Sequence, residues 1–367
     1  MPTIPHIKLS FDSVNLTWVS QTNSVPNTKC LPGFPLKQKE RAANMKLLAL
    51  TFGDETCAST QYRILQYRPL MEATGISLVH TPAKSFNDWE SLPQYDTVIL
   101  QKTLLSRRKI RRIAKGARRL LYDSDDRIWL RPGKPYGWLT AFRIKMRLTL
   151  IARVAHQCIA ANGIIAEDLN QHGAKTTVIP MALNGSVWRP SAPKKDTVTI
   201  GWTGSPSSLR YLEEIRPALV AAQQTHPQVH WVIHCGKNPN WTDFVYEHIP
   251  YVSGTEPEIV RKFHIGLLPL PVGTFAEGKS PIKALQYFAS GVALIHSPVG
   301  ATIELTNNNT LGLAAPSTLK WGEKVNTLVT DQKLRENMAA SARIFFESNH
   351  ERKSVFKHLV HQLVGER

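Results

Sequence analysis

The segment FAEGKSPIKALQYFASG (275–291) gathers side chains that could hold a phosphate group. Ser280 and the proline after it are typical of the N-cap and first position of a helix. A helix N-terminus presents free backbone N–H groups and the positive end of the helix dipole, and both favour an anion. Lys279 and Lys283 would add positive charge, and Gln286 could hold a sugar hydroxyl. The alternative is an ordinary capped helix that ends at a glycine.

A second candidate is the segment IGWTGSPSSLRYL (200–212), which predicts a strand, a turn rich in small and hydroxyl residues, and a helix. Gly201 and Gly204 permit close approach of a ligand to the backbone. Ser205 and the hydroxyl residues near it can donate hydrogen bonds. The segment matches neither the P-loop nor the GxGxxG pattern. Taken alone, it is interpreted more simply as an ordinary strand-to-helix turn.

Carboxylates cluster in LYDSDDRIW (121–129), at the end of another predicted strand. Asp125 and Asp126 could hold sugar hydroxyls, act as a base or bind a metal. They could equally cap a helix and pair with Arg127 and Arg131. The residues alone leave both interpretations open.

The first predicted strand is followed by GDETCASTQYR (53–63), where small residues would let a substrate approach the backbone at Gly53. Arg63 could pair with a phosphate, or it could be a solvated helix residue. Cys57 lies in the same loop, but no base can be paired with it. The sequence shows no Ser/His/Asp arrangement, no HExxH motif and no metal-ligand spacing, so neither a protein nucleophile nor a metal is expected.

Alternating short apolar runs and helical periodicity must position these residues, which predicts parallel sheets covered by helices. Strands are predicted at 46–51, 97–101, 119–122, 157–160, 176–179, 197–201, 229–234, 264–268 and 292–296. Helices are predicted at 61–74, 106–117, 137–155, 164–172, 209–224, 281–290, 319–330 and 332–346. A Pro- and Lys-rich break at 188–196 separates two such series. Two α/β domains whose strand ends face each other would form a ligand cleft.

The domain boundaries follow from these series. Residues 1–44 are polar and look detached from the fold, so we expect a disordered extension or a natural start at Met45. The first domain is expected over 45–190 and the second over 191–347. A C-terminal helix within 348–367 is expected to pack back on the first domain. No transmembrane helix and no secretory signal are evident.

Positive charge is concentrated in one stretch of the chain. The 367 residues carry 45 Lys and Arg against 28 Asp and Glu, a net charge of +17. Residues 102–153 hold 16 of the basic residues and only three acids. This stretch is either a solvated helix face or a patch for an anionic partner. Nucleic acid is not favoured, because 102–121 contains no aromatic residue that could stack on bases.

Several segments, in order, carry a resemblance to the GT-B glycosyltransferases, specifically the family 4-like retaining enzymes of cell-envelope and surface polysaccharide assembly. The resemblance spans about residues 45–347 and is most specific in the last of the five segments. These are STQYRILQYRPLMEATGISL, LLYDSDDRIW, VIPMALN, IGWTGSPSSLRYL and GLLPLPVGTFAEGKSPIKALQYFASGVALIHSPVG.

The resemblance implies two Rossmann-like domains that face each other across a cleft, with a nucleotide-sugar donor bound mainly by the second domain. The implied donor-binding residues are Gly204, Ser205, Lys279, Ser280 and Gln286. Among the cations there, Lys279 and Lys283 would have the catalytic role of stabilising the departing diphosphate, without any metal or other cofactor.

Acceptor-binding residues implied by the same resemblance lie in the first domain and are Gly53, Arg63, Asp125 and Asp126. VIPMALN departs from the family pattern after its Ile-Pro, and two positions of the donor segment depart from it as well. Gly278 stands where the first of two glutamates eight residues apart is usual, and Gln286 stands at the second. An uncharged Gln would bind a ribose hydroxyl more weakly than Glu.

We therefore expect a retaining hexosyltransferase that uses a nucleotide-diphosphate-sugar and a lipid-linked or saccharide acceptor in envelope polysaccharide synthesis. A nucleotide-sugar-binding relative with impaired catalysis is the alternative, and a nucleic-acid-binding protein is a weaker one. We also expect a cytoplasmic protein, peripheral on the inner face of the membrane, that contacts anionic lipid through 102–153. Trp129, Trp138 and Phe142 are candidates for insertion, with electrostatic adhesion expected to be the stronger effect.

Overall fold

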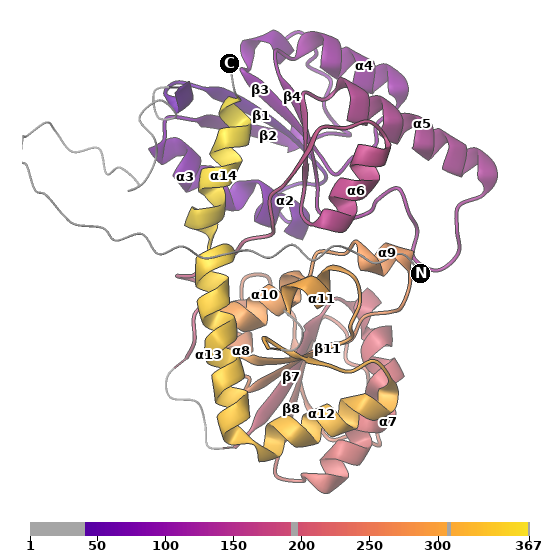
Figure 1. The fold of residues 1–367 in the computed structure, drawn as a ribbon, viewed down its shortest axis with the longest axis vertical. Coiled ribbons are helices and arrows are strands. Elements are labelled where there is room, and N and C mark those ends of the chain that lie inside the picture. Colours follow the sequence, from indigo (N-terminus) through magenta and orange to yellow (C-terminus); the bar gives the residue numbers. More distant parts are fainter. Residues whose placement is uncertain (1–40, 192–196, 307–309, 366–367) are drawn as a thin grey trace, which may run out of the picture.

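Two α/β domains make up the structure, a computed structural model that describes residues 41–191, 197–306 and 310–365. The domains lie one above the other in Figure 1, and each is built around a sheet of six parallel strands. The central strands of both sheets are buried along nearly their whole length, as expected when helices cover both faces. The predicted fold class, two Rossmann-like domains, is confirmed.

The first sheet has the strand order β2-β1-β3-β4-β5-β6. Its strands are β1 (Lys46–Thr51), β2 (Ser77–Pro82), β3 (Thr97–Gln101), β4 (Leu120–Ser124), β5 (Gln157–Ala160) and β6 (Thr176–Val178). The helices of this domain are α2 (Ala58–Arg63), α3 (Arg68–Ala73), α4 (Arg107–Gly116), α5 (Trp138–Val154) and α6 (Gly163–Gln171). Two apolar clusters, one on each face of the sheet, form its core.

The continuous helix predicted at 61–74 is wrong. The chain forms α2, a 3-10 turn at Leu65–Tyr67 and then α3, with Pro69 in the first turn of α3. A proline ring removes one backbone donor and clashes with the carbonyl four residues before it, which disfavours a continuous helix through this position. The break also separates Arg63, which turns inward, from the solvent-facing side of α3.

The second sheet has the strand order β12-β11-β10-β7-β8-β9. Its strands are β7 (Thr199–Gly204), β8 (His230–Cys235), β9 (Glu247–Pro250), β10 (Ile265–Leu268), β11 (Ala293–His296) and β12 (Leu313–Ala314). The helices are α7 (Leu209–Thr225), α8 (Glu256–Val260), α9 (Thr274–Glu277), α10 (Ile282–Ala289), α11 (Ala301–Leu305), α12 (Thr318–Thr330) and α13 (Gln332–Asn349).

The C-terminal helix α14 (Arg352–Val364) crosses back to the first domain, where Figure 1 shows it beside β1 and β2 as the continuation of α13. Five of its apolar side chains are buried in the core cluster that contains Leu47 and Ile99. The Thr97 hydroxyl donates a hydrogen bond to the Leu363 carbonyl at 3.0 Å. The last helix therefore ties the end of the chain to the first sheet.

Both predicted boundary segments extend partly outside the described residues. The expectation of a detached extension at 1–44 falls on undescribed residues as far as position 40. Ala42, however, is buried in the core of the first domain, so the fold begins before Met45. The predicted linker at 188–196 begins with Trp188, which is buried against the second domain, and its residues 192–196 lie outside the described part.

Candidate functional site

The carboxyl-terminal ends of the two sheets face each other, and hydrogen bonds join them across the cleft. The Ser280 hydroxyl donates to the Asp125 carbonyl oxygen at 2.7 Å. The Asn162 side-chain amide donates to the Gly278 carbonyl oxygen at 3.2 Å. Asp125 and Asn162 follow β4 and β5, whereas Gly278 and Ser280 precede α10. The candidate site therefore lies where parallel strands end, which is where α/β sheets bind ligands.

The predicted phosphate-binding helix begins one residue later than expected. Pro281 occupies the N-cap position of α10, and Ser280 is not the cap, because its hydroxyl is committed to the other domain. The Ile282 N–H donates to the Ser280 carbonyl at 2.8 Å. The next two N–H groups, of Lys283 and Ala284, have no acceptor within the helix. This end of α10 can still receive an anion through those groups and the helix dipole.

A narrow hollow of about 50 Å³ brings together the two segments that the sequence marked for phosphate binding. Ser208 and Trp202 line it from the β7 side, and Lys279 and Lys283 line it from the α10 side. Gly204 ends β7 beside this hollow, and a Cβ there would stand 2.1 Å from the Trp202 ring. Glycine at this position is therefore required by packing as well as useful for close approach of a ligand.

The turn after β7 carries hydroxyl groups that already bond to one another. The Ser205 hydroxyl lies 2.9 Å from the hydroxyls of Ser207 and of Ser208. Ser205 and Ser207 are exposed, so these hydroxyls can be reoriented by a ligand without loss of a buried bond. The predicted donor-binding position of Ser205 is thus at the rim of the hollow.

Lys283 has an electrostatic environment unlike that of a surface lysine. Burial and the nearby charge of Lys279 lower the pKa of Lys283 to about 8, although Glu256 opposes the shift. A desolvated ammonium group next to a second cation is destabilised in the free protein. A bound polyanion would relieve this repulsion, which is the electrostatic signature expected of a phosphate site.

Gln286 is buried in α10 with an unsatisfied acceptor. Its Nε2 donates to the Tyr62 hydroxyl of the first domain at 3.3 Å. Its Oε1 is buried and has no hydrogen-bond partner. Burial and the nearby Glu256 raise the pKa of Tyr62 to about 12, so its hydroxyl stays protonated. An orphaned acceptor at this place fits a ligand hydroxyl that would donate to it.

Near Gln286 lie three further side chains that the sequence did not single out, namely Tyr251, Glu256 and His234. None of them belongs to a recognisable motif. Tyr251 follows β9 and donates its hydroxyl to Glu256 at 2.8 Å. Its ring lies 5.6 Å from that of His234, at the end of β8. Burial lowers the pKa of His234, whose Nε2 is buried without a partner. The only signal in the sequence was their position at the carboxyl ends of strands.

On the first-domain side, the carboxylates of Asp125 and Asp126 share one buried cation, Lys102. The Lys102 ammonium lies 3.3 Å from Asp125 Oδ1 and also contacts Asp126. The Ser59 hydroxyl donates to Asp125 at 2.6 Å. Lys102 has a φ of 47°, rare for a residue with a side chain, and this places its amine in the cleft. Lys102 is therefore not part of an exposed basic surface, although it lies within the basic stretch 102–153.

Burial raises the pKa of Asp126, and the repulsion of Asp125 adds to this, while Lys102 and Lys279 act in the opposite direction. The cation expected at the donor diphosphate is therefore near enough to act on a carboxylate of the other domain. The predicted donor and acceptor residues thus meet across the cleft.

Arg63 lies one layer behind the cleft. Its side chain is 4% exposed and forms a salt bridge with the buried Asp123. It also donates to the Ile179 carbonyl at 2.8 Å. The guanidinium is satisfied by these groups, so the structure gives Arg63 a supporting position under Asp125 rather than a free face toward a phosphate.

Gly53 lies at the cleft, where a Cβ would stand 2.8 Å from Cys57 Cβ.

Arg127 clamps the loop that carries Lys279. Its guanidinium makes two hydrogen bonds of 2.7 Å with the Asp168 carboxylate, and the Trp129 indole N–H donates to the same carboxylate at 2.7 Å. The third arm of Arg127 donates to the Thr274 carbonyl of the other domain at 2.7 Å. The pairing of Asp125 and Asp126 with Arg127 that the sequence left open is not formed, because Asp168 holds this side chain.

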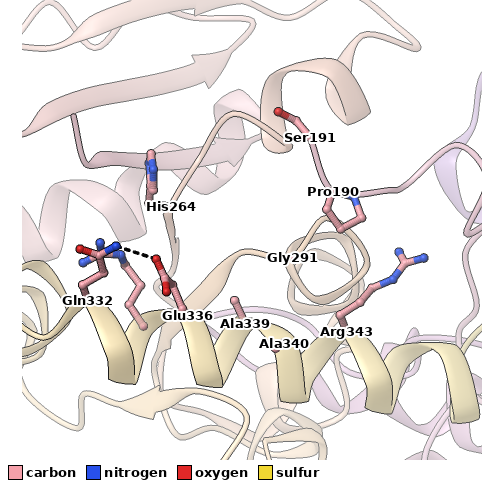
Figure 2. Close-up of a pocket in the computed structure, with 10 residues that line it drawn as sticks. Pro190, Ser191, His264, Gly291, Gln332, Glu336, Ala339, Ala340 and Arg343 are labelled. Atoms are coloured by element: carbon pink, nitrogen blue, oxygen red, sulfur yellow. Dashed lines mark hydrogen bonds between the residues drawn. The ribbon is translucent and has the colours of Figure 1, made fainter. Parts of the chain in front are cut away.

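A larger hollow, of about 620 Å³, lies away from the cleft (Figure 2). His264 and Gly291, which line it, precede β10 and β11, so it is at the amino ends of the strands. Figure 2 shows the α13 side of this hollow, where Gln332 donates to Glu336 at 2.8 Å. Its position at the wrong end of the sheet separates it from the candidate site.

Within residues 41–191, 197–306 and 310–365, no three His, Cys, Asp or Glu side chains gather in a way that could hold a metal ion. In the same ranges, no helix combines the length and the apolar character needed to cross a bilayer.

Solved structures with the same architecture cover nearly the whole chain. Anabaena HepE in complex with UDP and glucose has a TM-score of 0.67 at 14% identity, covering 88% of this chain and 100% of HepE. Sucrose-phosphate synthase from Thermosynechococcus elongatus has a TM-score of 0.63 at 13% identity over 87% and 99% of the two chains. A glycosyltransferase from Rickettsia africae has a TM-score of 0.61 at 12% identity over 89% and 100%.

No protein-family model and no curated protein sequence matches the chain. At this identity, the solved structures show the fold alone. The two domains of this protein have the GT-B fold of these neighbours.

Proposed function

We propose that this protein is a glycosyltransferase that moves a sugar from a nucleotide-diphosphate-sugar to a saccharide or lipid-linked acceptor, with retention of configuration, in envelope polysaccharide synthesis. The second domain holds the donor through Gly204, Ser205, Lys279, Ser280 and Gln286. The first domain presents the acceptor near Gly53, Asp125 and Asp126. Solved neighbours that contain UDP, with glucose or as UDP-glucose, support a nucleotide-sugar donor.

The observation that carries this proposal is the convergence of cations on one helix end. Lys279, Lys283 and the first N–H groups of α10 line the same hollow as the turn after β7. Burial, and after it the nearby Lys279, lower the pKa of Lys283, so its ammonium group is desolvated and lies near a second cation in the free protein. A diphosphate would complete this arrangement.

Lys279 and Lys283 supply electrostatic stabilisation in the transfer step. The bond between the anomeric carbon and the diphosphate oxygen breaks, and the acceptor hydroxyl oxygen bonds to that carbon. The hydroxyl proton passes to the departing phosphate. Charge develops on the leaving oxygen, so the two ammonium groups and the α10 dipole contribute most in the transition state. This chemistry requires no protein nucleophile.

A donor screen tests the proposal. The purified chain is incubated with UDP-, GDP- and ADP-sugars, and the release of nucleoside diphosphate is measured. We expect release from at least one donor, and a loss of about 100-fold or more in Lys279→Ala. Lys333→Ala, an exposed change on α13, is the control and should leave turnover unchanged. Tight donor binding without release would instead identify a nucleotide-sugar-binding relative, and turnover by Lys279→Ala equal to wild type would refute the site.

A further inference from the structure

The first half of α5 exposes large apolar side chains to solvent. Trp138, Leu139, Phe142 and Met146 are 78%, 50%, 60% and 37% exposed. Figure 1 shows this end of α5 projecting beyond the rest of the first domain. Burial of apolar side chains is the main favourable contribution to folding. Four such side chains exposed along two turns of one helix therefore indicate a surface that binds a partner.

These side chains form one continuous stripe. At about 100° per residue, the four positions fall within an arc of about 100° on the helix surface. The opposite face carries Leu148 and Ile151, which are buried in the core of the first domain. The stripe is therefore separate from the face that α5 uses to pack on its own domain.

Cations border the stripe on both sides. By the same geometry, Arg143 lies on one side of it and Lys145 on the other, and both are exposed. From residue 127 to residue 153 the sequence contains no Asp or Glu. The neighbouring helix α4 adds exposed basic residues, namely Arg107, Arg108, Arg111, Arg112 and Lys115. An apolar stripe flanked by long cationic side chains is the arrangement of a helix that lies in a membrane interface.

We propose that the first half of α5 inserts its apolar stripe into the headgroup region of an anionic membrane surface, while α4 and the flanking cations contact the lipid phosphates. The sequence led us to expect that electrostatic adhesion would be stronger than insertion. The exposed apolar stripe instead makes insertion a principal contribution to membrane binding. Trp129 is removed from the inserting set, since it is buried and bonded to Asp168. A nucleic acid would gain little from Leu139 and Met146, which offer neither hydrogen bonds to bases nor an aromatic ring to stack on them.

The loop 127–137 connects this stripe directly to the cleft. It begins next to Asp126 and ends at the first turn of α5. Insertion of α5 would thus hold the acceptor side of the cleft close to the lipid surface. On the proposed function, this favours an acceptor that is itself anchored in the membrane. The insertion proposal does not depend on that function and is tested without donor or acceptor.

The test uses the full chain and vesicles made of equal parts phosphatidylcholine and phosphatidylglycerol. Binding is measured by co-sedimentation for wild type and for the variant Trp138→Ser/Leu139→Ser/Phe142→Ser. We expect about a tenfold or larger loss of vesicle binding in the variant. Val245→Ser/Val272→Ser, which removes apolar side chains that are 79% and 95% exposed elsewhere, is the matched control and should bind as wild type does.

A second measurement covers the case in which the triple variant does not fold. Vesicles with dibrominated acyl chains should quench part of the tryptophan fluorescence of wild type, and this part should be absent in Trp138→Phe. Equal vesicle binding by wild type and a folded triple variant, or equal quenching of wild type and Trp138→Phe, would overturn the proposal. So would a wild-type protein that ignores anionic vesicles, including one that retards single-stranded RNA instead.

Discussion

The side chain of Arg127 fills the space next to Gly278, so that a Cβ at position 278 would stand 2.2 Å from Arg127 Cδ. Arg127 belongs to the first domain and Gly278 to the second. The family pattern suggested by the sequence has a glutamate at this position. In this protein the space for that side chain is taken by an arginine that is fixed by Asp168. The missing glutamate is thus coupled to a contact between domains.

This relationship predicts that introducing a glutamate, or any other side chain, at position 278 will impair the protein. Gly278→Glu or Gly278→Ala should displace Arg127 or the loop before α10, and with it Lys279. Because small displacements of a positioning group cost up to about 100-fold, we expect a 10- to 100-fold lower kcat/KM for the donor. The measurement is steady-state nucleotide release by each variant.

A double-mutant cycle isolates the cause. If the clash is responsible, Arg127→Ala/Gly278→Ala will lose less activity than the two single changes combined, since Arg127→Ala makes room for the new Cβ. Strictly additive losses would show that Gly278 acts in some way other than through Arg127.

Gln286 gives a prediction that separates ligand binding from stability. Gln286→Leu removes the buried Oε1 that has no partner, together with the hydrogen bond from Nε2 to the Tyr62 hydroxyl, so the free energy of unfolding should fall by no more than about 1.5 kcal/mol. The donor KM should nevertheless rise about tenfold, since a ligand hydroxyl would lose its acceptor. Urea unfolding and donor kinetics on the same preparations provide the two values. A Leu variant with unchanged KM would remove Gln286 from the donor site, and Gln286→Glu, which keeps the acceptor, is the matched control.

The sequence predicted the architecture because buried parallel strands are short continuous apolar runs. The central strands β1, β3 and β5 were located within a residue of their bounds. The strands that were missed, β2, β9 and β12, lie at sheet edges and are only partly buried. An edge strand pairs on one side and needs no such run, so composition alone gives it little signal.

The candidate site was predictable only where its residues are close in the sequence. Lys279, Lys283 and Gln286 share one helix and its approach loop, which made them visible as a group. The contacts of Tyr62 with Gln286 and of Arg127 with Thr274 depend on how the domains meet. Nothing local marks those partners. Lys102 was misassigned for the same reason, because the carboxylates that bury it follow a different strand.

The buried pair of Arg63 and Asp123 predicts a stability effect beneath the cleft. Asp123→Ala leaves the Arg63 guanidinium buried without its counter-charge and should lower the free energy of unfolding by about 3–5 kcal/mol. Arg63→Met/Asp123→Leu removes both charges and should cost clearly less. Chemical denaturation of the two variants measures the difference. Equal losses would mean that the pair itself is not what stabilises this part of the domain.

Lys283 predicts a pH dependence of donor use. Its pKa of about 8 means that the ammonium loses its proton, and so its charge, as the pH rises through 8. Both phosphates of a nucleotide-diphosphate-sugar are linked on two sides, so neither has a second ionisation in this range and the donor charge does not change with pH. The value of kcat/KM, which reports the free enzyme, should therefore fall above pH 8 by up to tenfold per pH unit. Lys283→Arg keeps its charge well above this pH and should flatten the alkaline limb, whereas Lys283→Ala should be slow at every pH. A wild-type profile that stays level to pH 10 would contradict a role for the Lys283 charge in holding the diphosphate.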